Sequence, residues 1–247
     1  DKAYCVTPLP DGGFAACGAL TLGTSNSAAW IIRTDENGDT LWTREWGWEY
    51  NDKAMRVLYL DGGLTVLTHG RLVTTLGGPH IVRYDMNGIL LWQTSIPELY
   101  DEHGQDMCYS PADGGYTIVT NYGPKVAHTD SLGNLEWIAG VPDVSQPYGW
   151  SINRTMEGGY IYGGQNTPNP DEPWTEYFGV ISRYYPCGEM MWYDWIYEGC
   201  MCIYSIRQLS EGGYIAAGKT LNLTGIIIKY APETGVEEGS GLPEETI

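Results

Sequence analysis

The chain has 247 residues, and its 31 acidic and 13 basic side chains give a formal net charge of −18. A surface of this charge repels nucleic acid and anionic lipid, so we expect neither as a partner. No apolar run reaches the roughly 18 residues that a membrane-spanning helix needs, and no transmembrane segment is predicted. Apolar residues make up 43% of the chain, which is enough to form a sizeable core.

An acidic residue followed by two glycines occurs five times along the chain. The copies begin at Asp11, Asp61, Asp113, Glu157 and Glu211. Each copy is followed by a short apolar run and then by a turn that contains glycine. In the first four copies a tryptophan comes after that turn. A spacing of about 50 residues that fills the whole chain predicts a repeat architecture.

The first copy shows the predicted elements in chain order. Strands are expected at 3–9, 14–20, 29–34 and 40–46, and Asp-Glu-Asn-Gly at 35–38 forms a turn. Four short antiparallel strands in about 50 residues are typical of a propeller blade. We therefore predict an all-β, five-bladed β-propeller of four-stranded antiparallel blades, which would cover 1–50, 51–100, 101–142, 143–199 and 200–235.

The later copies keep this order but differ in one connection. The segment between the second and third strands is short in the third copy, at 121–124, and long in the fourth copy, at 166–176. In repeat proteins, loops on one face usually carry binding specificity. We expect this class of loop to determine what the protein binds.

The fifth copy has no tryptophan after its last turn, and an acidic, glycine-rich tail follows at 236–247. One interpretation is that the tail adds the missing strand to its own blade. The other is that the tail docks on the open edge of a neighbouring copy and builds a homopolymeric filament. The assembly contacts would then come from Val236, Leu242, Pro243 and Ile247.

Two sets of motifs resemble known proteins. Asp-Gly-Gly-Tyr at 113–116 and the turn from Asp130 to Trp137 resemble units of secreted bacterial β-propeller repeat proteins, with turns similar to those of quinoproteins and Asp-box proteins. The stretch 231–236, together with Leu242 and Pro243, resembles a linker to a C-terminal sorting domain. The resemblance implies a bacterial protein that is secreted or lies on the cell surface. The start at Asp1 without Met and the six cysteines agree with export.

The cysteines predict one disulfide and no zinc motif. Cys5 and Cys17 lie at nearly equal distances from the first hairpin turn, so cross-strand pairing would bring them within bonding range. No Cys-x-x-Cys pair and no cysteine–histidine cluster has zinc spacing.

Catalytic motifs are missing from the sequence. The four histidines, His69, His80, His103 and His128, each fall in a different local context, and no second histidine or cysteine lies two or four residues away from any of them. No Gly-x-Ser-x-Gly motif is present, and the arginines on strands occur singly. We therefore expect no enzyme activity and no required cofactor. Calcium is the one metal candidate, with Asp35, Asn37 and Asp39 as alternating oxygen ligands. A turn with glycine in the left-handed conformation explains the same residues.

Aromatic residues near blade ends form the binding candidates. Trp48, Trp150 and Trp174 could stack on sugars, or they could pack between blades. Asn153 and Asn222 match the N-glycosylation sequon. The leading hypothesis is a secreted, non-enzymatic structural or adhesive propeller that forms the repeating subunit of an extracellular filament. The alternatives are a carbohydrate-binding propeller and, third, a glycoside hydrolase, whose carboxylate pair is defined in space and not in sequence.

Overall fold

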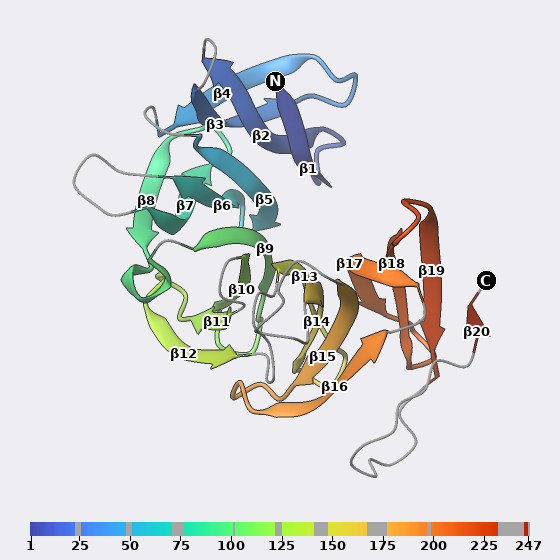
Figure 1. The fold of residues 1–247 in the computed structure, drawn as a ribbon. Helices are drawn as coiled ribbons and strands as arrows, with labels where there is room; N and C mark the ends of the chain where they lie inside the picture. Colours follow the sequence, from blue (N-terminus) through green and yellow to red (C-terminus); the bar gives the residue numbers. More distant parts are fainter. Residues whose placement is uncertain are drawn as a thin grey trace. The chain divides into compact units, whose positions relative to one another are not determined.

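The structure is a computed structural model of residues 1–247. It describes 1–22, 26–47, 51–70, 77–100, 102–121, 125–140, 148–166, 177–196, 199–231 and 245–246. These residues form antiparallel β-strands and one 3₁₀ helix, η1 (Pro97–Leu99), as Figure 1 shows. Among them there is no helix of the length and hydropathy needed to cross a membrane.

The chain divides into two compact units. The first contains 1–105 and 132–134, and the second contains 106–131 and 135–247. The first unit holds two four-stranded sheets, each with its strands in chain order. The first sheet contains β1 (Lys2–Pro8), β2 (Phe14–Leu22), β3 (Asn26–Thr34) and β4 (Thr40–Trp46). The second contains β5 (Lys53–Leu60), β6 (Gly63–Gly70), β7 (Gly78–Asp85) and β8 (Leu90–Ser95).

The following strands form two groups of four. The third group contains β9 (His103–Tyr109), whose first residues belong to the first unit, with β10 (Tyr116–Asn121), β11 (Lys125–Thr129) and β12 (Leu135–Gly140). The fourth group contains β13 (Tyr148–Arg154), β14 (Tyr160–Asn166), β15 (Phe178–Tyr184) and β16 (Met190–Ile196). The pair Asn121 and Tyr148 links β10 to β13, so the two groups count as one eight-stranded sheet.

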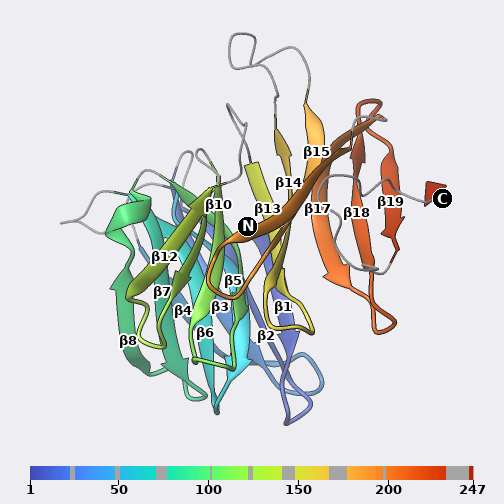
Figure 2. The same cartoon turned by 90° about the horizontal axis from the view of Figure 1, so that it is seen from below.

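The last sheet contains β17 (Cys200–Gln208), β18 (Tyr214–Thr220), β19 (Gly225–Tyr230) and β20 (Glu245–Thr246). β20 lies beside β19 in Figures 1 and 2. It pairs Thr246 with Ile228 and Glu245 with Lys229. The tail therefore supplies the fourth strand of the last sheet in its own chain. This agrees with the interpretation in which the tail adds the missing strand to its own blade.

Each unit has its own apolar core between sheets. In the first unit Ala15 and Ile31 from the first sheet pack with Val66 and Val82 from the second, and all four are fully buried. In the second unit Ile161 and Ile181 pack against Ile203 and Ile206 of the last sheet. Alternation of buried and exposed positions, as in β19, places one set of side chains in the core.

The sheet edges are joined by recurrent side-chain contacts. In the first unit Trp42 Nε1 donates a hydrogen bond to Met86 O at 2.9 Å, so the tryptophan of one sheet contacts the turn of the next. In the second unit Trp137 packs onto the turn at Gly188. Both turns have a glycine with positive φ, +74° at Gly88 and +86° at Gly188, and Gly38 in the predicted turn at 35–38 has φ +88°. This confirms the prediction of a left-handed glycine in that turn.

Candidate functional site

A charged pair recurs in the sheets and joins the Gly-Gly turn to the third strand. In the first sheet the Arg33 guanidinium binds the Asp11 carboxylate, and in the fourth group Arg183 Nη2 lies 3.2 Å from Glu157 Oε2. In the last sheet Lys229 Nζ lies 3.7 Å from Glu211 Oε1. In the second sheet Arg83 donates instead to the backbone oxygens of Leu60 and Asp61. A basic side chain thus ties the turn to the third strand in each of these sheets.

The second glycine of the turn makes this approach possible. A Cβ atom at Gly115 would collide with Thr129 O and lie 2.9 Å from His128 Nε2. Only glycine lets the turn come this close to the third strand. The turn then holds its own acid in place, because Gly115 N donates to Asp113 Oδ1 at 3.0 Å.

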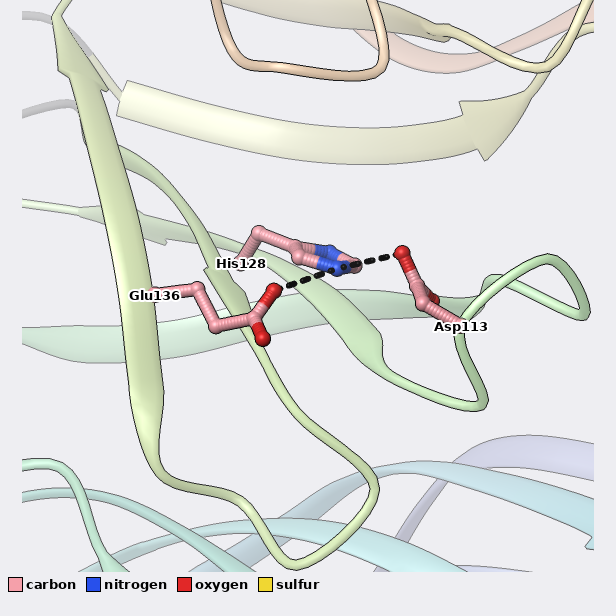
Figure 3. A group of neighbouring side chains, drawn as sticks. All are labelled: Asp113, His128 and Glu136. Atoms are coloured by element: carbon pink, nitrogen blue, oxygen red, sulfur yellow. Dashed lines mark hydrogen bonds and ion pairs between the residues drawn. The ribbon is translucent and has the colours of Figure 1, made fainter.

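In the third group a histidine takes the position of the basic residue. His128 on β11 is 1% exposed, and its Nε2 lies 3.2 Å from Asp113 Oδ2. A second carboxylate comes from the neighbouring strand, where Glu136 Oε2 of β12 lies 3.7 Å from the same nitrogen. Figure 3 shows Asp113 and Glu136 approaching the imidazole along the two dashed lines. We call Asp113, His128 and Glu136 the histidine–carboxylate cluster.

Two positions of the third group differ from the equivalent positions in the other sheets, which the strand register identifies. His128 pairs with Trp137, as Arg33 pairs with Trp42, Arg83 with Trp92 and Arg183 with Trp192. The residue before the tryptophan is Glu136 here. The equivalent residues in the other three sheets are Leu41, Leu91 and Met191. The third group therefore combines a histidine with an added carboxylate, and the corresponding pairs in those three sheets are Arg with Leu or Met.

The imidazole is held on its other side by buried groups of the second unit. Thr117 Oγ1 lies 2.8 Å from His128 Nδ1, and the Tyr160 hydroxyl lies 3.4 Å from the same nitrogen. The Trp137 ring stacks on the imidazole, with 5.3 Å between ring centroids and an interplanar angle of 18°. These contacts fix the ring plane and direct Nε2 toward the carboxylates.

The two carboxylates face solvent while the imidazole does not. The Asp113 side chain is 45% exposed and that of Glu136 is 50% exposed. Burial raises the pKa of Asp113, but hydrogen bonds from Gly115 and Ser110 and the proximity of His128 outweigh it, so the net pKa lies below its ordinary value. Asp113 is thus ionised at neutral pH and available as an oxygen ligand.

The cluster has the donors of a metal site. One nitrogen and two carboxylate oxygens, one from each residue, all lie within 4.8 Å of one another. This arrangement suits ion binding or charge pairing. Residue spacing around each histidine does not reveal the cluster, because its members come from a turn and two strands.

The candidate calcium residues form a turn. Asp35 Oδ1 accepts hydrogen bonds from Asn37 N and Asp39 N, both at 2.9 Å. Asp85 makes the equivalent bonds in the second sheet. The Asp35 carboxylate thus stabilises the turn before β4, which agrees with the alternative explanation of these residues. Calcium binding there stays a prediction.

The two sequons differ in their surroundings. Asn153 Nδ2 donates to Ile206 O at 2.8 Å and to Ser151 Oγ at 3.3 Å. Since a glycan is attached to that nitrogen, these bonds disfavour glycosylation at Asn153. Asn222 lies in an exposed turn between β18 and β19, and its glycosylation stays a prediction.

Of the three tryptophan candidates, the structure describes Trp150. It is partly buried, stacks with Tyr148 at 6.4 Å and meets Tyr204 edge-on at 5.3 Å. Its Nε1 is buried and has no hydrogen-bond partner among the described residues. The ring therefore packs within the second unit, while Tyr204 is 45% exposed. Trp48, Trp174 and the four assembly candidates, Val236, Leu242, Pro243 and Ile247, lie outside the described residues.

The predicted disulfide partners face each other across the first hairpin. Cys5 and Cys17 are register partners on β1 and β2, as the sequence indicates. Both are free cysteines in this structure, and the disulfide stays a prediction. The hydrogen bond with the Cys5 thiol, followed by burial, raises the pKa of Cys17.

An all-β fold of antiparallel sheets with repeated turns defines a β-propeller-like protein, and solved structures support this class. The β-propeller domain of Cps50 (Swd1) from Myceliophteria thermophila is similar, with a TM-score of 0.61 and 11% identity over 99% of this chain and 72% of that one. The Pan2 WD40 domain of Neurospora crassa gives a TM-score of 0.60 at 11% identity, over 92% of this chain and 62% of that one.

A bacterial protein of unknown function, from Dyadobacter fermentans, is also similar. Its TM-score is 0.58 at 10% identity, over 92% of this chain and 78% of that one. No protein-family model matches the chain, and no curated protein matches it. Because the identities are low, these similarities show the fold alone.

Proposed function

We propose that the chain is a five-bladed, non-catalytic propeller that serves as a binding scaffold. The blade count is supported by the five Gly-Gly turns and by strands that fall into five groups of four. The similarity to β-propeller and WD40 domains supports the same fold. Propellers present loops from rigid sheets, which suits them to binding.

One observation carries the proposal: in the first four groups of strands, length varies most in one class of connection. The links between second and third strands are 23–25, 71–77, 122–124, 167–177 and 221–224, and they differ several-fold in length. The links between first and second strands all contain the short Gly-Gly turn. A scaffold needs constant turns for folding and variable loops for recognition. We therefore assign recognition to the links between second and third strands.

The test exchanges the longest of these loops. Replacing 168–176 with a Gly-Ser linker of equal length should abolish binding on glycan and peptide arrays and leave the thermal unfolding midpoint unchanged. The matched control replaces 141–147, the link between β12 and β13, in the same way and should bind as the native chain does. The proposal fails if the native chain binds nothing on either array, or if the 168–176 variant binds as well as the native chain.

The chemical class of the partner is a second question, and a glycan is the candidate that the aromatic residues favour. Tyr204 is exposed beside Trp150, whose ring is fixed by Tyr148. Aromatic faces can stack on sugar rings. Tyr204→Ala should weaken glycan binding if this surface takes part, and Tyr193→Ala, which removes another exposed tyrosine, is the control.

Filament assembly is the alternative that the last sheet favours. β20 pairs with two residues of β19, and no strand covers the outer edge at Gly225–Ile227 among the described residues. Such an edge can accept a strand from another copy. An extracellular, secreted location in a bacterium belongs to this proposal and rests on the motif resemblance.

Deletion of 236–247 distinguishes a tail that pairs only within its own chain from a tail that joins neighbouring copies. If subunits are joined by the tail, the native protein should form long assemblies in electron microscopy and light scattering, and the deletion variant should stay monomeric. If the native protein is monomeric at all concentrations tested, or if the deletion variant still polymerises, the filament proposal is wrong.

A further inference from the structure

We propose that Asp113, His128 and Glu136 bind a divalent transition-metal ion, with zinc as its best representative. The first support is the combination of donors. Imidazole favours Zn²⁺ and related transition metals, whereas calcium takes six to eight oxygen ligands. A site with one nitrogen and two carboxylates therefore selects against calcium and for the zinc class.

The second support is distance. Zinc binds nitrogen and oxygen ligands at about 2.0–2.2 Å, so two ligands of a tetrahedral ion lie about 3.4 Å apart. His128 Nε2 lies 3.2 Å from Asp113 Oδ2 and 3.7 Å from Glu136 Oε2. Small rotations of the two solvent-facing carboxylates would bring all three donors to one ion.

The third support is the hydrogen-bond partner of the other imidazole nitrogen. The Thr117 hydroxyl, 2.8 Å from Nδ1, can accept the Nδ1 proton and leave Nε2 as the ligand atom. Metal-bound histidines commonly have such a partner on their other nitrogen.

The fourth support is the internal comparison between sheets. Arg33, Arg83 and Arg183 satisfy the same turn with a permanent positive charge and cannot bind a metal ion. The third group replaces the arginine with a residue that can be a ligand, and at the next position it replaces an apolar residue with Glu136. A simple charge pair needs the first change only, whereas a three-ligand site needs both.

The bound ion would have three protein ligands and one open coordination position. Three ligands with an open position occur in sites that also take water or a group from a partner. The exposed carboxylates leave the ion accessible from solvent. The ion would therefore both fasten the Gly-Gly turn to β11 and β12 and offer a contact point on the surface.

The experiment is a zinc titration of the EDTA-treated, dialysed full chain, followed by isothermal calorimetry and thermal unfolding. The native chain should bind one Zn²⁺ at this site with a raised unfolding midpoint. His128→Arg restores the residue found in three other sheets, so it should fold with the charge pair intact and lose both signals. Glu136→Leu should weaken zinc binding by about tenfold or more.

Glu189→Gln is the matched control, because it removes one exposed carboxylate in a turn of the fourth group and should leave zinc binding unchanged. The proposal is overturned if zinc neither binds nor stabilises the native chain, or if His128→Arg retains the native response. It is also overturned if calcium raises the midpoint through these residues while zinc does not. In those cases His128 only pairs with the carboxylates in the place that arginine takes in the other sheets.

Discussion

Arg183 and Lys229 hold equivalent positions in two sheets but have different surroundings. Arg183 is 3% exposed and donates to the Tyr214 hydroxyl and to Tyr184 O, as well as to Glu157. Lys229 is 54% exposed and pairs with Glu211. Removing Arg183 breaks its buried hydrogen bonds and leaves Glu157, whose side chain is 60% exposed, whereas an exposed pair contributes little.

We therefore expect Arg183→Gln to lower the free energy of unfolding by about 1–3 kcal/mol and Lys229→Gln by less than about 1 kcal/mol. Urea unfolding followed by tryptophan fluorescence measures both. Equal losses in the two variants would mean that burial does not govern the energetics of the repeated pair.

His69 and His80 lie buried in the first unit. Their burial predicts that the free energy of unfolding depends on pH. Burial lowers the pKa of His69 from its ordinary 6.5 to about 3, with smaller effects from His103, Lys53 and His80. Burial also lowers the pKa of His80 to about 4, although a hydrogen bond to Gly78 O opposes it. Both imidazoles are therefore neutral in the fold at pH 5, while the unfolded chain binds protons below about 6.5.

Above pH 6.5 the two histidines should therefore not reduce the free energy of unfolding. As the pH drops from 6.5 toward 4, that free energy should fall by about 1.4 kcal/mol per pH unit for each histidine. His80→Gln cannot take up this proton, so its stability should depend less steeply on pH than that of the native chain. Urea unfolding at pH 7 and pH 5 gives the two slopes. Parallel slopes for variant and native chain would exclude His80 as a source of the pH dependence.

At the scale of elements, the glycine turns and the tryptophans of the preceding sheet determine the packing between sheets. Gly188 has φ +86°, and a Cβ atom there would lie 2.5 Å from a ring carbon of Trp137. Gly38 has the same backbone conformation, φ +88°, but a Cβ atom there would meet nothing within 4 Å. The two positions separate backbone strain from loss of packing.

Gly38→Ala should cost about 1–2 kcal/mol from the left-handed backbone alone. Gly188→Ala should cost about 2 kcal/mol more, because the tryptophan must also shift. Thermal and urea unfolding of both variants measure the difference. Similar losses would show that Trp137 adapts freely and that the turn contact contributes little.

Local features of the sequence predict most of these elements. The Gly-Gly turns, the left-handed glycines and the register of Cys5 with Cys17 follow from residue spacing, because turns and hairpins depend on neighbouring residues. The histidine–carboxylate cluster does not follow from local spacing. Its ligands meet only after β10, β11 and β12 pair in a particular register.

One comparison within the sequence could still have revealed the cluster. Aligning the copies on their tryptophans places His128 opposite the strand arginines and Glu136 opposite Leu41 and Leu91. The distances among the three side chains, on which the metal proposal rests, are not given by any alignment. The partners of Trp150 are unpredictable for the same reason, because Tyr204 lies in another sheet.

At the scale of the whole molecule, the repeat and the tail determine where each group of strands obtains its fourth strand. Four groups take their fourth strand from the residues that follow the third strand, and the last sheet takes it from Glu245–Thr246. A strand supplied from a distance along the chain closes the last sheet at the cost of ordering a longer connection. The proposed five-bladed scaffold therefore depends on where the tail binds.

The most direct measurement of this account is a crystal structure of residues 1–247. It should show five four-stranded antiparallel sheets in a propeller, with the last sheet completed by Glu245–Thr246 of the same chain. Another number of sheets, or a last sheet left with three strands, would contradict the account. A fourth strand donated by a neighbouring molecule would replace the single-chain scaffold with the filament.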